Sequence, residues 1–128
     1  MKRVLFVCVE NACRSQIAEG FARHYGHGKL EAFSTGSQPR GQVDQQAIAV
    51  MRERGIDISG HTSKSVSALP SGEWDAVVTM GCGEACPAVP AKQRVDWHIP
   101  NPAHLSVDGY RQLRDVIEAH VKTLIDAL

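Results

Sequence analysis

The sequence has neither an excess of one charge nor a long apolar segment. Its 14 lysines and arginines equal its 14 aspartates and glutamates, so the overall charge gives no reason to expect nucleic acid or a membrane surface as a partner. The apolar run 4–9 is shorter than the roughly 7 to 15 residues of a signal-peptide core, and no run approaches the ~18 residues of a membrane span. We therefore expect a cytoplasmic protein with no nucleic-acid and no membrane partner.

Internal repeats, low-complexity segments and linkers are also absent, which favours a single domain over residues 1–128. Apolar runs rich in β-branched residues predict strands, and segments with apolar residues at helical spacing predict helices. The strands are expected at 2–8, 30–35, 74–80 and 95–99, and the helices at 15–25, 43–54 and 107–128. This alternation predicts an α/β fold in three layers, with a central four-stranded parallel sheet flanked by helices on both faces.

Four cysteines in a reducing compartment are more often catalytic or metal-binding than disulfide-bonded. The first, Cys8, ends a predicted strand, and Arg14 and Ser15 follow at the start of a predicted helix, in a C-x5-R-S pattern. The N–H groups of such a loop and of the helix N-terminus can converge on an anion, to which Arg14 adds further donors. The same positive surroundings favour the thiolate form of Cys8. Since the loop has no lysine and no GxxxxGKS or GxxxxGKT pattern, it predicts a thiolate aimed at a bound oxyanion and not a nucleotide-binding loop.

The stretch CVENACRSQIAEG at 8–20 resembles the active-site loop of the low-molecular-weight protein tyrosine phosphatase fold, and more closely that of the arsenate reductases built on this fold. Further matching motifs are STG at 34–36, GIDISGHTSK at 55–64, WDAVVTMGCGEACP at 74–87 and DWHIPNPA at 96–103. The resemblance implies arsenate as the substrate, phosphate or sulfate as its analogues, no bound cofactor, and an external thiol reductant. The residues expected to bind the oxyanion are Val9, Glu10, Asn11, Ala12, Cys13, Arg14 and Ser15.

A second cysteine pair, Cys82 and Cys86, follows the third predicted strand. In a parallel sheet the loops after the strands share one edge, so this pair and Cys8 are expected on the same side of the molecule. The resemblance implies a disulfide relay in which Cys8 attacks arsenate, Cys82 attacks Cys8 and releases arsenite, and Cys86 attacks Cys82. The expected catalytic residues are Cys8, Arg14, Cys82 and Cys86. The final disulfide is expected to be reduced by thioredoxin; the alternative is that a low-molecular-weight thiol, with a glutaredoxin-like partner, intercepts Cys8 or Cys82.

Three positions depart from the pattern of the family. Asn101 stands in the leaving-group loop, where relatives carry the aspartate that protonates the leaving group. Possible substitutes are Asp96, His98 and His104. Lys64 stands at an acidic position of the potassium site that some relatives have, so we expect either its ammonium in place of a metal ion or a solvated surface lysine. Glu10 stands where many relatives carry glycine, and its side chain is expected to point outward.

Two alternatives to a reductase remain open. The first is a low-molecular-weight phosphatase that hydrolyses phosphomonoesters through Cys8, with Cys82 and Cys86 incidental. The second is a non-catalytic sensor of an oxyanion or a metal. The cysteine spacings also suit a zinc site, although zinc would occupy Cys8 and leave Arg14 without a role. Cys13 has no step in the relay, and we expect it to be a small buried packing residue.

Overall fold

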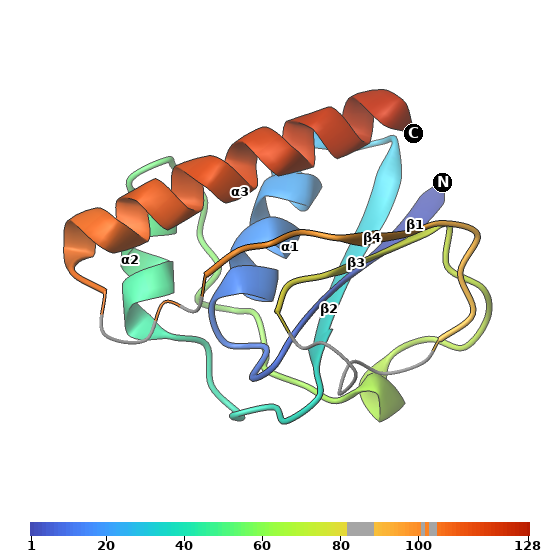
Figure 1. Cartoon of the computed structure of the whole chain (residues 1–128), viewed down its shortest axis with the longest axis horizontal. Helices are drawn as coiled ribbons and strands as arrows, with labels where there is room; N and C mark the ends of the chain where they lie inside the picture. Colours follow the sequence, from blue (N-terminus) through green and yellow to red (C-terminus); the bar gives the residue numbers. More distant parts are fainter. Residues whose placement is uncertain (82–88, 101, 103–104) are drawn as a thin grey trace.

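The described part of the chain forms one parallel sheet and three α-helices (Figure 1). The computed structural model describes residues 1–81, 89–100, 102 and 105–128. In chain order the elements are β1 (Lys2–Cys8), α1 (Arg14–Tyr25), β2 (Leu30–Gly36), α2 (Gln45–Arg52), the 3-10 helix η1 (Val66–Ala68), β3 (Ala76–Thr79), β4 (Arg94–Asp96) and α3 (Val107–Ala127). The strands pair in the order β2-β1-β3-β4, all parallel. The expected α/β class and four-stranded parallel sheet are confirmed. None of the described helices is both long and apolar enough to cross a membrane.

The last two strands are shorter than predicted. β3 is confined to Ala76–Thr79 within the predicted range 74–80. β4 ends at Asp96, although a strand to residue 99 was expected. The N–H of Ile99 donates to the carbonyl of Trp97 at 2.9 Å, and this tight turn directs the chain out of the sheet.

Two helix starts also differ from their predicted positions. α1 begins at Arg14, with Cys13 as the residue before it, and α2 begins at Gln45 and not at 43. The start of α2 is set by Asp44, whose carboxylate accepts a hydrogen bond from the N–H of Gln46 at 2.8 Å. A side-chain acceptor at this position satisfies one of the unpaired N–H groups of the first turn.

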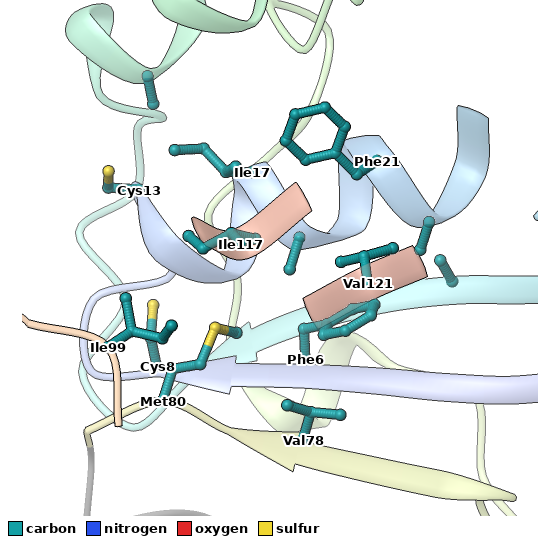
Figure 2. Packing of buried hydrophobic residues seen from close by; sticks show 14 of the residues in the cluster. Phe6, Cys8, Cys13, Ile17, Phe21, Val78, Met80, Ile99, Ile117 and Val121 are labelled. Atoms are coloured by element: carbon teal, nitrogen blue, oxygen red, sulfur yellow. The ribbon is translucent and has the colours of Figure 1, made fainter. Parts of the chain in front are cut away.

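The larger apolar core lies on one face of the sheet. Side chains alternate along β1, so that Val4, Phe6 and Cys8 point to this face. All three α-helices contribute buried residues to the same core. Figure 2 shows some of them over β1, including Ile17, Phe21, Ile117 and Val121. Cys8 is therefore directed toward the start of α1, on the helical side of the sheet.

The opposite face of the sheet has a smaller apolar core around Leu5, Val7 and Val77. Trp74 and Val89 pack there, and in the described residues the cover is extended chain together with the segment of η1. Helices were expected on both faces of the sheet, but the three α-helices all lie on one face. On the other face, the described part of the chain supplies the short helix η1.

β1, β3 and β4 end at the same edge of the sheet. Val7 pairs with Thr79, and Thr79 pairs with Asp96. The loop that follows Cys8 and the chain that follows β3 therefore begin side by side, as the parallel topology predicts. The structure describes the chain after β3 as far as Gly81, and Cys82 and Cys86 lie outside the described residues.

Candidate active site

The loop of residues 9–13 connects β1 to α1, and the segment 37–44 holds its carbonyl groups. The carbonyls of residues 8, 9, 10 and 12 accept hydrogen bonds from the N–H groups of residues 37, 38, 40 and 44, at 3.3, 2.7, 3.0 and 2.8 Å. In a trans peptide the N–H points opposite to the carbonyl, so the following N–H groups face the other way. In the described residues, no protein acceptor is found for the N–H groups of 9–13. The loop therefore presents a row of free donors, as an anion site requires.

Asn11 holds the loop in this shape. Its φ of 50° is a left-handed conformation, which asparagine adopts more readily than most residues. The Asn11 amide donates to Ser15 Oγ at 2.8 Å, and its Oδ1 accepts from the N–H of Lys64 at 2.9 Å. Gly36 lies so close that a Cβ there would be 2.6 Å from the carbonyl oxygen of Val9. The backbone of the loop is thus held from inside by Asn11 and from outside by β2.

Cys8 is buried at the end of β1, with 2% of its surface exposed. Its Sγ lies 2.9 Å from Ser15 Oγ. Because the Ser15 oxygen already accepts the Asn11 amide hydrogen, the hydroxyl hydrogen is free to point at the sulfur. This hydroxyl and the positive N-terminal end of α1 stabilise a negative charge on Cys8. The surroundings therefore suit a nucleophilic thiolate.

A cavity of about 120 Å³ lies over the loop. Its lining residues are Cys8, Val9, Glu10, Ala12, Cys13, Arg14, Arg40, Asp44, Pro102 and Tyr110. The structure thus brings Cys8 together with five of the seven residues predicted to bind the oxyanion. The other two, Asn11 and Ser15, are buried behind the loop and hold it through their hydrogen bonds.

Four residues of the cavity wall were not predicted from the sequence: Arg40, Asp44, Pro102 and Tyr110. The hydroxyl of Tyr110 donates to Asp44 Oδ2 at 2.8 Å, joining α3 to the start of α2. The helical spacing placed Tyr110 on the apolar face of its helix, where it does lie buried. Pro102 lies in the DWHIPNPA motif, but no local pattern marks Arg40, Asp44 or Tyr110 as part of a site, because only the packing of distant segments brings them to the loop.

The predicted outward direction of Glu10 is confirmed. Its side chain is 48% exposed and forms an ion pair with Arg40, whose Nε lies 2.6 Å from Glu10 Oε2. Arg40 therefore neutralises the carboxylate of Glu10, which is itself a residue of the loop. This pairing reduces the repulsion that an unpaired carboxylate would exert on a bound anion.

Lys64 is not a solvated surface residue. Its side chain is 21% exposed, and its Nζ lies 3.1 Å from the carbonyl oxygen of Thr62, 3.4 Å from Ser34 Oγ and 3.8 Å from Glu19 Oε1. Glu19 is buried, and the Ser34 hydroxyl also donates to it. Burial lowers the pKa of Lys64, and the Glu19 carboxylate opposes that shift. The ammonium is thus held by the Glu19 carboxylate, the Ser34 hydroxyl and the Thr62 carbonyl, which favours the first of the two expectations for Lys64.

Several predicted residues are not part of the described site. Cys82, Cys86, Asn101 and His104 lie outside the described residues. Asp96 and His98 are described, but neither lines the cavity. Among the described residues, no three His, Cys, Asp or Glu side chains are grouped as a metal site would need. The zinc hypothesis also required Cys82 and Cys86, so it stays a prediction.

Known proteins with similar sequences match nearly the whole chain. Residues 3–128 match the family described as low molecular weight phosphotyrosine protein phosphatase. The glutaredoxin arsenate reductase of Synechocystis sp. is 40% identical over 128 residues, which cover 98% of this chain and 97% of that protein. The arsenate reductase of Halalkalibacterium halodurans is 36% identical, with 98% of this chain and 96% of that protein covered.

Solved structures of arsenate reductases are similar over the same length. One such enzyme in its phosphate-binding state matches with a TM-score of 0.88 and 38% identity, over 99% of this chain and 98% of that chain. A thioredoxin-dependent arsenate reductase of Corynebacterium glutamicum matches with a TM-score of 0.80 and 31% identity, over 99% of this chain and 61% of that chain.

Proposed function

The chain belongs to the low molecular weight phosphotyrosine protein phosphatase family, together with its arsenate reductases, and we propose that it reduces arsenate to arsenite through a covalent bond between Cys8 and arsenic. One observation supports this reaction. One small cavity is lined by Cys8, by Arg14 and by the loop between them, whose N–H groups have no acceptor among the described residues. Donors of this kind bind a tetrahedral oxyanion while a thiolate attacks its central atom.

The reaction divides into three thiol steps. The Cys8 thiolate attacks arsenic, an S–As bond forms, and one arsenate oxygen leaves as water after protonation. Cys82 then attacks the Cys8 sulfur, so that the electron pair of the S–As bond stays on arsenic and arsenite leaves. Cys86 attacks Cys82, which frees Cys8 and produces a Cys82–Cys86 disulfide. The two electrons gained by arsenic therefore come from the two thiols of that disulfide.

Asn101 supports a reductase over a phosphatase. Expulsion of an alkoxide or phenoxide from phosphorus needs a proton donor at the leaving group, and an amide does not supply one. Arsenate loses water from a centre that carries its own protons, so reduction tolerates asparagine better. We expect slow hydrolysis of an aryl phosphate by this protein. Rapid hydrolysis that persists in a Cys82→Ser variant would favour the phosphatase alternative.

The catalytic cycle needs an external thiol reductant, and we propose thioredoxin. One relative is called a glutaredoxin arsenate reductase and another is thioredoxin-dependent, so both donor systems belong in the test. The assay follows arsenate-dependent NADPH oxidation with thioredoxin and its reductase, in parallel with glutathione, glutaredoxin and glutathione reductase. We expect turnover with the first system. Turnover only with the second would contradict thioredoxin as the donor and leave arsenate reduction intact.

The order of the relay is tested with a Cys86→Ser variant. This variant should complete one turnover and then retain a Cys8–Cys82 disulfide, which peptide mass mapping detects. A Cys13→Ser variant is the matched control, because Cys13 lies in the same loop but has no step in the relay. A Cys8–Cys13 disulfide in place of Cys8–Cys82 would overturn the proposed order.

We also expect no resident metal ion. Potassium and sodium should support equal turnover, because the Lys64 ammonium already lies beside Glu19, Ser34 and Thr62. A Lys64→Met variant that gains a dependence on potassium would support this role of the ammonium, and a potassium requirement of the unaltered protein would contradict it. Stoichiometric zinc in anaerobically purified protein would contradict the catalytic mechanism itself.

A further inference from the structure

Gly81 lies against the guanidinium of Arg14. It follows Met80 at the carboxyl end of β3 and has a φ of 84°. A Cβ on Gly81 would lie 2.5 Å from Arg14 Nη1 and 3.6 Å from Arg14 Cζ. Non-bonded carbon and nitrogen atoms do not approach so closely. The guanidinium therefore occupies the space that any side chain at position 81 would need.

The same nitrogen of the guanidinium is held by the chain after β4. Arg14 Nη1 donates to the carbonyl of Ile99 at 3.2 Å. That carbonyl is itself positioned, since the N–H of Ile99 donates to Trp97 and the N–H of Trp97 donates to Thr79, both at 2.9 Å. Arg14 is buried, and its Nη1 lies against both segments. A long, flexible side chain thus has one of its donors committed to the protein and the rest of its planar group set in a fixed place.

We propose that Gly81 is a positioning residue that seats the Arg14 guanidinium against the oxyanion loop. A side chain at position 81 would push the guanidinium out of its place beside Ile99. The loop would then lose the charge-assisted hydrogen bonds that depend on a fixed planar fork. This inference rests on the proposed function, in which Arg14 binds the tetrahedral oxyanion. Gly81 does not touch the substrate and acts through Arg14.

If glycine were required at position 81 only for its backbone conformation, the expected results would be different. Any residue with a Cβ is disfavoured at a φ of 84°, whatever lies nearby. Gly55 provides a matched control, because its φ is 74° and a Cβ there would meet nothing within 4 Å. Gly81→Ala and Gly55→Ala thus carry a similar backbone strain, and only the first displaces Arg14.

The direct test measures the binding of inorganic phosphate by titration calorimetry. Phosphate is used in place of arsenate turnover because Gly81 immediately precedes Cys82 in the sequence, and turnover would also report on the relay. Loss of a charge-assisted hydrogen bond corresponds to about a tenfold or greater weakening. We expect that weakening for Gly81→Ala and unchanged affinity for Gly55→Ala. Equal affinity of Gly81→Ala and the unaltered protein would overturn the proposal.

A double-mutant cycle with Arg14→Ala covers the case in which Gly81→Ala folds poorly. Because removal of the guanidinium frees the space, Gly81→Ala should lower the melting temperature less in the Arg14→Ala background than in the unaltered protein. It should also weaken phosphate binding no further there. Additive effects on both measurements would overturn the proposal. A protein that shows this coupling but does not reduce arsenate would contradict only the proposed function.

Discussion

Cys8 and Cys13 lie at the two ends of one loop and are both buried, yet their surroundings have opposite effects on the stability of a thiolate. Their exposed fractions are 2% and 6%. Cys8 Sγ lies 2.9 Å from the Ser15 hydroxyl, which stabilises negative charge on the sulfur. Cys13 is buried in the apolar core, and its thiol pKa is raised first by burial and then by the charge of Asp44. Figure 2 shows Cys8 beside Met80 and Ile99, with Cys13 on the far side of the start of α1.

The comparison shows that burial alone does not decide the chemistry of a thiol. Both cysteines belong to the same apolar core, but the Cys8 sulfur has a hydroxyl donor beside it, whereas the Cys13 thiol is subject to the negative charge of Asp44. Desolvation by apolar groups disfavours the thiolate, and donors replace the lost water. One loop can therefore hold a reactive and an inert cysteine.

The largest expected effect comes from removing the reactive thiol. Cys8→Ser should reduce arsenate-dependent turnover by at least about 10⁴-fold, the loss typical of a missing nucleophile. The loop donors and Arg14 remain, so phosphate should bind with nearly unchanged affinity. Turnover is measured by NADPH oxidation and binding by calorimetry. Residual turnover near the original rate would assign the nucleophile to another thiol.

A smaller effect should follow from removing the donor at Cys8. Ser15→Ala removes a hydrogen bond to a charged sulfur, so alkylation of Cys8 by iodoacetamide at pH 7 should slow by about tenfold. Ser15→Thr keeps the hydroxyl and should stay close to the original rate. If Ser15→Ala reacted at the same rate, the backbone donors and the helix terminus would be sufficient to stabilise the thiolate.

The Cys13 thiol should make the free energy of unfolding fall as the pH is raised into the alkaline range. Because the pKa of Cys13 is raised by folding, its thiol stays protonated in the native state while the unfolded chain loses the proton above a pH of about 9. The unfolded state then binds fewer protons, so stability falls as pH rises, by about 1.4 kcal/mol per pH unit from this group. Tyr110, whose pKa is also raised by burial, adds to the decline at higher pH.

This slope is measured by urea unfolding at several pH values from 7 to 10.5. A Cys13→Ala variant should lose the Cys13 part of the decline, and Cys8 should be the thiol of this loop that iodoacetamide labels at pH 7. An unchanged slope in Cys13→Ala would show that the thiol ionises in the folded protein as readily as in the unfolded chain.

The smallest effect is expected at neutral pH from the same variant. Cys13→Ala removes one buried sulfur from the core, at a cost of about 1 kcal/mol of unfolding free energy. Turnover should stay within about twofold, since Cys13 forms no hydrogen bond as the capping residue of α1. Thermal unfolding and the NADPH assay measure both. A loss of turnover approaching that of Cys8→Ser would give Cys13 a role in the reaction.

Much of the active-site loop could be predicted from local sequence. The apolar run that ends at Cys8 and the helical spacing after Arg14 located the loop, and the C-x5-R-S spacing indicated an anion site. The residues behind the loop were harder to find. Lys64 and Gly36 lie far from Cys8 in the chain, and their contacts depend on how β2 and the segment after α2 pack against the loop. The early end of β4 was missed because its cause is one hydrogen bond between Ile99 and Trp97.

The sequence by itself determined the order of strands and helices, the position of the thiol and arginine, and the family to which they point. These features are encoded locally, in periodicity and in spacing along the chain. Only the tertiary structure decided which thiol faces donors, which residues close the cavity, and what seats the guanidinium of Arg14. Those outcomes depend on contacts between the loop and residues that are distant in the sequence, such as Gly81, Asp44 and Tyr110. The free energy of this packing depends on the whole fold, so no short stretch of sequence determines it.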